Sequence, residues 1–517
     1  MTAQPVQSAQ AVVPEAVARI REPVHIVVTP EGSIAAAVHP AAGQRVVGTL
    51  PPLYPERLGD RGFCEAHGIR FAYVAGEMAN GISTTALVKA MAQADMLAFF
   101  GAGGVPLPDV QRAVRTLVEE LPGRANWGVN LIHNPLDPAQ EEAVVNLLLY
   151  HRVPTVSVSA FMDLTPTVVR LATSGLRRDQ AGRVVRRTRV VAKVSRPETA
   201  EKFLRPPPAD LLAKLRADGR ITQDEARLAA RIPVASDLTV EADSGGHTDN
   251  RPLTSLLPRI IELRDRAGDL VEPGQATRVG AAGGLGTPQG VAAAYAAGAA
   301  YVLTGSVNQV CVEAGVSSDA KALLAQADVA DTMMASSSDM FELGVRVQVL
   351  RRGTMFGARS NQLYEAYRDH GSLEEIPPGL RQRLERTILR ATFDEVWDET
   401  RRYWQMRAPA VLAQAEADPK ARMALVFRWY VGKASRWAIE GDISRRGDYQ
   451  LWCGPALGAF NHWVAGSFLA HPANRDVVQV ARNLLEGAAV LTRAHQLRTF
   501  GVAVPSHAFR FTPRRLA

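Results

Sequence analysis

The hydrophobic pattern between residues 71 and 306 alternates short apolar runs with longer amphipathic segments. The apolar runs are continuous rather than interrupted at every second position, which is typical of parallel strands buried on both faces. Segments of helical period, such as 84–94 and 108–121, follow the runs. The pattern predicts eight strands, at 71–76, 97–101, 126–131, 155–159, 188–194, 236–242, 278–284 and 301–305.

Eight strand–helix units predict an α/β fold of the closed (β/α)8 TIM barrel type. The alternative is a doubly wound open sheet, which would carry a glycine fingerprint in its first strand-to-helix turn. The first turn is AGEMANG at 75–81 and lacks that fingerprint. The closed barrel is therefore the favoured fold, and we assign it to residues 61–350.

One strand–helix unit is longer than the others and carries a helical insertion at 195–232. A proline-rich break follows its first helical segment, and the pair Asp218-Gly219 predicts the turn of a helical hairpin. Residues 1–60 form an N-terminal segment that contains one candidate strand at 24–30 and is otherwise unassigned.

Strand signals stop in the segment 351–517, where the pattern is helical throughout. Ser372 and Glu375 have the spacing of a capping box, and six of the seven tryptophans lie in this segment. The change in composition predicts an all-helical C-terminal subdomain that serves a substrate or partner. Its aromatic residues are interpreted as packing.

Composition is that of a soluble globular protein, with 47% apolar and 21% charged residues. The three cysteines, Cys64, Cys311 and Cys453, lie far apart, which argues against a disulfide framework or a zinc ribbon and favours a reducing compartment. No apolar run is long enough to span a membrane, and no secretory signal opens the sequence. We therefore expect a cytoplasmic protein that does not bind membranes.

Charge is spread thinly, since 59 basic and 52 acidic residues give a formal charge of +7. This balance does not indicate a nucleic-acid partner. The local cluster LRRDQAGRVVRRTR at 176–189 has two interpretations, a solvated loop or a docking patch for an acidic partner. The arginines concerned are Arg177, Arg178, Arg186 and Arg187.

Two glycine-rich loops follow the last two predicted strands, AAGGLGTPQG at 281–290 and TGSVNQ at 304–309. Thr287 and Pro288 are a suitable N-cap and first residue for a helix. Backbone N–H groups at neighbouring helix starts can bind an anion, and the loops after strands seven and eight are the usual phosphate site of this fold. The pair of loops predicts a phosphorylated ligand.

The sequence VEADSGGHTDN at 240–250 follows the sixth predicted strand. A metal site would use Glu241, Asp243 and His247, but no second histidine or cysteine lies at ligand spacing, so no metal is expected. The two glycines allow a flat ligand to approach the backbone. His247 is then a candidate acid/base, with Asp243 as a candidate to orient its imidazole.

Several motifs together resemble a known superfamily. AGEMANGIS (75–83), WGVNL (127–131), SGGHTD (244–249) and the two glycine-rich loops are similar to the FMN-dependent nitronate monooxygenases and FabK-type enoyl reductases. Longer phrases, such as DMFELGVRVQVLRRGTMFGARSNQLYEAY and DYQLWCGPALGAFN, resemble the PfaD family of stand-alone enoyl reductases. The resemblance covers about residues 50–500, and a departure is Glu77, where a small residue is common.

The resemblance implies FMN in the mouth of the barrel. Ala75, Gly76 and Met78 would line the isoalloxazine edge, Asn130 would hydrogen-bond the ring, and Lys193 would face N1 and O2. Residues expected to hold the phosphate or otherwise contact the cofactor are Ser244, Gly245, Gly283, Gly284, Thr304, Gly305 and Ser306.

The reaction implied by the resemblance is reduction of the α,β-double bond of enoyl thioesters carried by acyl carrier protein domains, with NADPH or NADH as hydride donor and His247 as the catalytic residue. The enzyme would act in trans in polyketide or polyunsaturated fatty acid biosynthesis, and a homodimer is left open. The alternatives are a nitronate monooxygenase and a flavin-bearing scaffold without catalytic activity. The four arginines of 176–189 are candidates for carrier docking.

Overall fold

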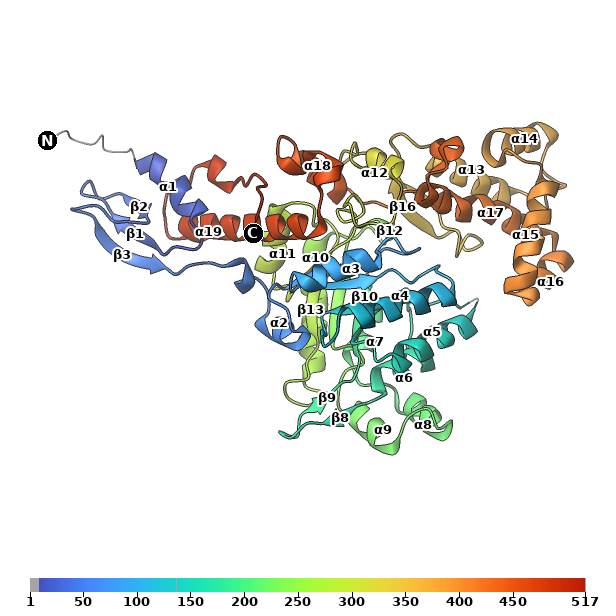
Figure 1. The fold of residues 1–517 in the computed structure, drawn as a ribbon, viewed down its shortest axis with the longest axis horizontal. Coiled ribbons are helices and arrows are strands. Elements are labelled where there is room, and N and C mark those ends of the chain that lie inside the picture. Colours follow the sequence, from blue (N-terminus) through green and yellow to red (C-terminus); the bar gives the residue numbers. More distant parts are fainter. Residues whose placement is uncertain (1–8, 136, 517) are drawn as a thin grey trace.

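The computed structural model describes residues 9–135 and 137–516. Its centre is a closed barrel of eight parallel strands in the order β10-β11-β13-β14-β4-β5-β6-β7 (Figure 1). The strands are β4 (Tyr73–Ala75), β5 (Leu97–Phe100), β6 (Trp127–Ile132), β7 (Thr155–Ser159), β10 (Arg189–Val194), β11 (Asp237–Glu241), β13 (Arg278–Ala282) and β14 (Val302–Thr304). All eight predicted strands and the TIM barrel are confirmed, and the open sheet is wrong.

Helices surround the barrel because each carries an apolar face toward the strands. They are α3 (Thr85–Gln93), α4 (Leu107–Glu120), α5 (Pro138–Tyr150), α6 (Pro166–Thr173), α7 (Pro197–Leu204), α10 (Leu253–Gly268), α11 (Pro288–Ala296) and α12 (Ser318–Leu324). Thr84, Thr165 and Thr287 cap three of them by accepting a backbone N–H, which is worth about 1 kcal/mol each. The expected N-cap at Thr287 is thus confirmed.

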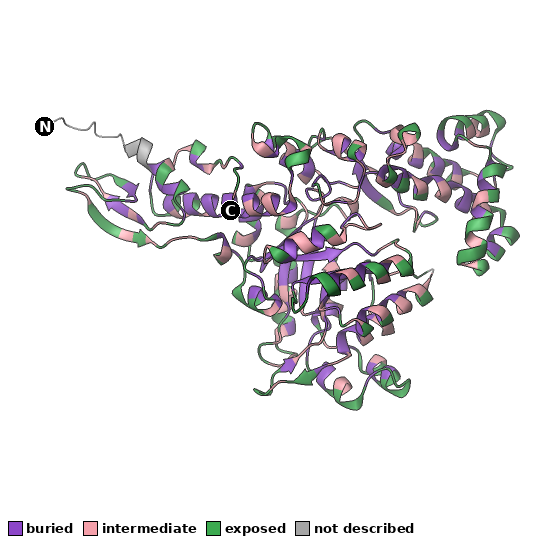
Figure 2. Ribbon diagram, in the orientation of Figure 1, coloured by how far each residue is buried: buried purple, intermediate pink, exposed green. Residues whose placement is uncertain are grey.

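The amino ends of the strands are closed by α2 (Arg61–His67). Phe63 of this helix stacks on Tyr301 with ring centroids 4.1 Å apart, and His67 Nε2 lies 3.0 Å from Asp237 Oδ2. All four side chains are fully buried. Figure 2 shows the barrel strands buried along their length, as continuous apolar runs require. This end of the barrel is therefore a packed core, which leaves the opposite end for a ligand.

The long unit after β10 contains α7 and then a hairpin of α8 (Ala209–Ala217) and α9 (Gln223–Ala229). The chain turns at Asp218 and at Gly219, whose φ of 66° lies in the left-handed region that favours glycine. The helix, break and helical hairpin expected within 195–232 are all present.

The N-terminal segment, unassigned from sequence, forms α1 (Ala9–Ala18) and a three-stranded antiparallel sheet. The sheet has the order β2-β1-β3, from β1 (Val24–Val28), β2 (Ile34–Ala37) and β3 (Arg45–Leu50), and η1 (Pro55–Arg57) leads into the barrel. The candidate strand at 24–30 is confirmed as β1. Figure 1 shows this sheet extending to one side of the barrel beside α19 (Val477–Thr499).

A second sheet lies at the carboxyl ends of the barrel strands and was missed from sequence. It has the order β12-β16-β15, formed by β12 (Gly246–His247), β15 (Thr332–Ser336) and β16 (Arg346–Leu350), all antiparallel. Because β12 lies within the loop after β11, this sheet joins the predicted catalytic loop to residues about 100 positions later.

Helices predominate after residue 350, as predicted. The helices are α13 (Phe356–Asp369), α14 (Pro378–Arg383), the π-helix η2 (Leu384–Leu389), α15 (Phe393–Arg407), α16 (Pro409–Ala417), α17 (Pro419–Glu440), η3 (Ile443–Asp448), α18 (Ala456–Val464), η4 (Phe468–Ala470), η5 (Pro472–Asn474), α19 and η6 (Ser506–Phe509). Figure 1 shows that α13–α17 extend to one side of the barrel, whereas α19 returns to the other side, against α11 and α1.

The capping box expected at Ser372 and Glu375 does not start a helix. Ser372 Oγ accepts from Glu375 N at 3.3 Å, but the helix begins only at Pro378. The full capping boxes in this part of the chain and in the insertion are at Thr392 with Glu395 and at Thr222 with Glu225. No helix among the described residues is long and apolar enough to cross a membrane.

Candidate active site at the barrel mouth

The predicted phosphate loops bring bare backbone to the mouth. Gly283 and Gly284 have φ of 87° and 73°, and a Cβ on Gly283 would lie 2.7 Å from Asp243 O. Next to Gly284 and Gly305, by contrast, the position of a Cβ has no atom within 4 Å. Among the described residues, the N–H groups of Gly284, Gly305 and Ser306 donate to no backbone acceptor. The two loops therefore offer free donors around an open space.

In the second loop, the side chains of Thr304 and Ser306, both predicted to contact the cofactor, make hydrogen bonds within the protein. Thr304 Oγ1 lies 2.6 Å from Tyr73 Oη and 3.3 Å from Asn308 Oδ1, so this hydroxyl is committed to the core. Ser306 Oγ accepts from Gly454 N at 3.1 Å. The Thr304 side chain is thus unavailable to a ligand, whereas the Ser306 hydroxyl, which accepts from Gly454 N, still has its own O–H to donate.

The segment 448–461 lies directly on these loops. A Cβ on Gly245 would lie 2.6 Å from Cys453 Cα, and a Cβ on Gly286 would clash with the carbonyl of Ala456. The segment also bridges β16 through Val349 and Trp452. Glycine is therefore required at position 245 because the backbone of Cys453 leaves no room for a Cβ.

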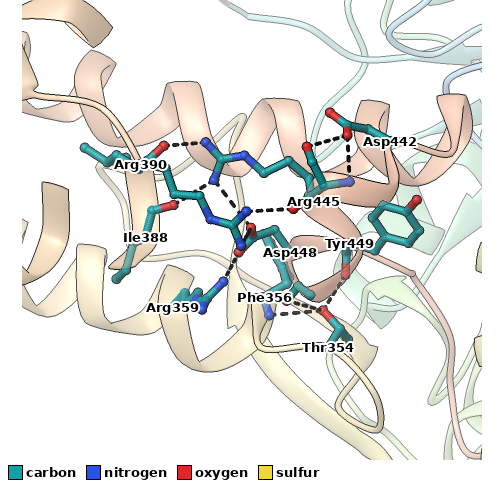
Figure 3. Close-up of polar contacts among 12 residues, drawn as sticks. Thr354, Phe356, Arg359, Ile388, Arg390, Asp442, Arg445, Asp448 and Tyr449 are labelled. Carbon is teal, nitrogen blue, oxygen red and sulfur yellow. Dashed lines mark hydrogen bonds and ion pairs between the residues drawn. The ribbon is translucent and has the colours of Figure 1, made fainter. Parts of the chain in front are cut away.

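Asp448 fixes this segment to the helical region (Figure 3). Its fully buried carboxylate accepts from Tyr430 Oη at 2.8 Å and lies 3.3 Å from Arg390 and 3.4 Å from Arg445. Arg359 makes a further ion pair with it. A buried carboxylate is stable only with such partners, so the mouth depends on contacts made by α13, α17 and η3.

His247 stands at the rim of the mouth on β12. Its Nε2 lies 3.1 Å from Ser337 Oγ and 3.2 Å from Asp339 Oδ1, on the loop before β16. Burial alone would lower the pKa of His247, but the hydrogen bond and charge of Asp339 outweigh it and raise that pKa. Burial would raise the pKa of Asp339, yet the partnership with His247 and Ser337 lowers it to about 2.

The prediction that Asp243 orients the imidazole of His247 is wrong. The Asp243 carboxylate accepts from Gln348 Nε2 at 2.7 Å and from Asn250 Nδ2 at 2.9 Å, so it holds the loop against β16. Asp339 takes the orienting position instead. Its motif, DMFELGV, was visible in the sequence, but no strand had been predicted there to bring it to the mouth.

Lys193 lies at the end of β10 between two carboxylates. Its Nζ is 3.1 Å from Glu241 Oε1 and 3.3 Å from Glu77 Oε1. Burial alone would lower the pKa of Lys193, but Glu241 and Glu77 outweigh burial and raise it. Ser244, another expected contact, donates to Glu241 Oε1 at 3.3 Å. Lys193 is therefore a charged cation held between two carboxylates.

Two buried acceptors at the mouth are left without a hydrogen bond. Asn130 Nδ2 donates to Ser159 Oγ at 3.1 Å, but its Oδ1 has no partner among the described residues. Glu77 Oε1 accepts from Ser157 Oγ at 2.9 Å, whereas Glu77 Oε2 is likewise unsatisfied in the described part of the chain. Buried acceptors of this kind require a donor, which water or a ligand in the mouth can supply.

The turn after β4 completes the mouth. Gly76 N donates to Thr304 O at 2.8 Å, and Met78 N donates to Ser83 Oγ at 3.1 Å, so the turn is held firmly. Ala75 is fully buried in β4, and the Met78 side chain is half-buried. No three histidine, cysteine, aspartate or glutamate side chains gather as a metal site within 9–135 and 137–516.

The arginine-rich hairpin lies at the wrong end of the barrel for carrier docking. It forms β8 (Arg177–Arg178) and β9 (Val184–Val185), between α6 and the amino end of β10 (Figure 1). Arg178 pairs with Glu272 at 2.7 Å, and Arg186 donates to backbone carbonyls before β11, where burial lowers its pKa to about 10. Arg178 and Arg186 therefore brace the amino ends of the strands, opposite to the mouth.

Comparisons with known proteins identify the families that the chain resembles. Residues 63–387 match the family model described as nitronate monooxygenase. Residues 370–449 match the inserted helical domain of [acyl-carrier-protein] S-malonyltransferase, which covers α14–α17 and η3.

Three proteins illustrate the similarity. The chain is 46% identical over 465 residues to a polyunsaturated fatty acid synthase polypeptide of Thraustochytrium sp., covering 89% of this chain and 31% of that protein. It is 42% identical over 452 residues to the polyketide biosynthesis protein PksE of Bacillus subtilis, covering 87% and 58%. The solved enoyl reductase domain of MlnA, from the macrolactin biosynthesis cluster of Bacillus amyloliquefaciens, superposes with a TM-score of 0.81 and 35% identity, covering 86% and 99%. The chain thus spans less than two thirds of the first two relatives.

Proposed function

The chain belongs to the nitronate monooxygenase family and groups there with enoyl reductases such as the MlnA domain, and from this premise we propose that it is an FMN-dependent enoyl reductase. It acts in trans on enoyl thioesters bound to acyl carrier protein, in polyketide or polyunsaturated fatty acid biosynthesis, with NADPH or NADH as donor. The observation that carries the proposal is a paired His247–Asp339 at the same mouth as an open anion cradle.

The residues present fit FMN. The open spaces beside Gly284 and Gly305, with free N–H groups, suit its terminal phosphate. The unsatisfied Oδ1 of Asn130 is an acceptor for the N–H of the flavin ring. The ammonium of Lys193 would lie near the ring, as expected from the resemblance.

Bound FMN would supply hydride chemistry, taking a hydride from the nicotinamide and passing one to the β-carbon of the enoyl thioester. His247 would then supply the proton that completes the reduction. Because Asp339 raises the pKa of His247, the imidazole keeps its proton to a higher pH than a free histidine does and can donate it to the α-carbon, or hydrogen-bond the enolate oxygen that develops beside it. Ser337 and Asp339 hold the ring in place for that transfer.

The helical region supports a carrier-bound substrate. The family matched by residues 370–449 is the helical insertion of an enzyme that acts on acyl carrier protein. In this chain the matched region holds Asp448 through Tyr430, Arg390 and Arg445 and, through Asp448, the segment that covers the cradle. A substrate delivered along this region would reach the mouth beside His247. The carrier domain, the cytoplasmic location and a homodimer stay predictions.

Intact-protein mass spectrometry tests the function. The protein is incubated with NADPH and an acyl carrier protein loaded with an enoyl thioester, and we expect the loaded carrier to gain the mass of two hydrogens. Anaerobic absorbance separates the rival activity within the same family. Bleaching of the flavin by NADPH supports the reductase, whereas bleaching by an alkyl nitronate with no response to NADPH would replace it with a nitronate monooxygenase.

A further inference from the structure

The mouth of the barrel holds more negative than positive charge around Lys193. Its ammonium has two carboxylate neighbours, Glu241 at 3.1 Å and Glu77 at 3.3 Å. Counted as ionised groups, the three carry one net negative charge. One carboxylate would suffice to pair the lysine, so the second requires its own explanation.

Of the two carboxylates, Glu77 has the larger free-energy cost of burial. Its side chain is 4% exposed, against 18% for Glu241. Only Oε1 has partners, Lys193 and Ser157, while Oε2 is buried without a hydrogen bond among the described residues. Burying an incompletely paired carboxylate costs several kcal/mol in general. Its retention at the carboxyl end of β4 therefore points to a role toward a ligand.

The charge of this cluster bears directly on a bound flavin. Hydride transfer to oxidised FMN delivers two electrons and one proton, so the reduced ring gains a negative charge unless a second proton follows. A lysine alone would favour that charge by Coulomb attraction, and a neighbouring carboxylate offsets the attraction. The side chains around the ring thus set the equilibrium between its oxidised and reduced forms.

We propose that Glu77 is a positioning residue that offsets Lys193 and so lowers the two-electron reduction potential of the flavin. This rests on the proposed function, since it requires FMN in the mouth. A lower potential makes the reduced flavin a stronger hydride donor toward the enoyl thioester and the oxidised flavin a weaker acceptor from the nicotinamide. Glu77 thereby favours the second half-reaction at the expense of the first.

The test is a spectroelectrochemical titration of the holoenzyme. Glu77→Gln keeps the shape of the side chain and removes its charge, and we expect the ratio of reduced to oxidised flavin at a given potential to rise at least tenfold, which is a shift of about 30 mV for a two-electron couple. Lys193→Met should move the ratio in the opposite direction. Two opposite shifts are not expected from a general loosening of the fold.

Two variants serve as controls. Glu77→Asp retains the charge and should stay near the parent potential. Glu486→Gln removes an equally buried carboxylate, 2% exposed and paired with Arg21 and Arg514 away from the mouth, and should leave the potential unchanged.

Several results would overturn the inference. The first is an unchanged or lowered reduction potential in Glu77→Gln. The second is an unchanged or raised reduction potential in Lys193→Met, and this result overturns the inference even if Glu77→Gln does not fold. If Glu77→Gln loses its flavin, Glu77 serves flavin binding instead, whether or not Glu77→Asp keeps its flavin. A parent protein that binds no flavin would refute the proposed function itself, which is distinct from all of these outcomes.

Discussion

Nε2 of His247 lies 3.2 Å from Oδ1 of Asp339, and the Ser337 hydroxyl bonds to both side chains. The contact exists because β12 pairs with β16 in register, His247 opposite Val347. The two side chains are about half exposed, so a substrate can reach the imidazole while the carboxylate holds it. Orientation and proton affinity of the imidazole are set by one neighbour.

Asp339→Asn should move the pH dependence of enoyl reduction. Asp339 raises the pKa of His247, so its neutralisation lowers that pKa and the protonated imidazole is lost at a lower pH. The alkaline limb of the rate profile should therefore shift toward lower pH, measured by stopped-flow oxidation of the reduced flavin with an enoyl thioester. Asp243→Asn is the matched control, because Asp243 contacts Asn250 and Gln348 instead, and should leave the limb in place. An unshifted limb in Asp339→Asn would contradict the assignment.

His247→Ala should separate the two half-reactions. Reduction of the flavin by NADPH needs no proton donor from the protein and should survive. Enoyl reduction should fall by roughly 10²–10⁴-fold, the usual cost of losing one positioned acid or base. Each half-reaction is followed by anaerobic stopped-flow absorbance. If turnover is unchanged, the proton comes from water or another side chain; if the flavin is lost, His247 is structural.

Gly305→Ala tests the anion cradle. The position of the new Cβ is open and the backbone is not left-handed, so the protein should fold normally, but the methyl group would occupy space beside the free N–H groups. We expect weaker FMN binding, measured by fluorescence titration of the apoprotein. Gly379→Ala is the control, since its Cβ also meets nothing within 4 Å and it lies in α14. Equal affinity of the two variants would argue against a phosphate at Gly305.

Asp448→Asn should destabilise the protein strongly. Removing one partner of a buried ionic cluster typically costs about 3–5 kcal/mol, and here Arg359, Arg390 and Arg445 would lose their shared carboxylate. Urea unfolding measures the change. Asp442→Asn, at the exposed N-cap of η3, should have a much smaller effect. A small effect of Asp448→Asn would mean that the segment after it is held by packing alone.

The barrel could be predicted because its signals are local. Each strand is a continuous apolar run, and each following helix has its own apolar face, so neighbours in sequence are neighbours in space. The glycine-rich loops after β13 and β14 could be placed at the mouth because they follow strands of the same strand–helix repeat. The resemblance to enoyl reductases of the PfaD type, drawn from motifs, is also confirmed by the comparisons.

The features that were missed depend on contacts distant in sequence. The strand β12 has only two residues and exists because β16 pairs with it. The Asp339 partner of His247 and the Glu77 partner of Lys193 follow from that pairing and from barrel closure, neither of which leaves a periodic trace. In the N-terminal sheet, β2 and β3 were missed for a different reason. They pair with β1 within residues 24–50, but β2 is mostly alanine, which is depleted in strands, and β3 contains a glycine.

The close approach of Gly245 to Cys453 has a consequence for the order of assembly. The barrel can form from contacts between consecutive units, but this contact requires closing a loop of roughly 200 residues, which is entropically costly and slow. The cradle is therefore completed after the barrel that carries it. During synthesis, the nascent chain would present an almost finished barrel with an open mouth until residues beyond 448 leave the ribosome.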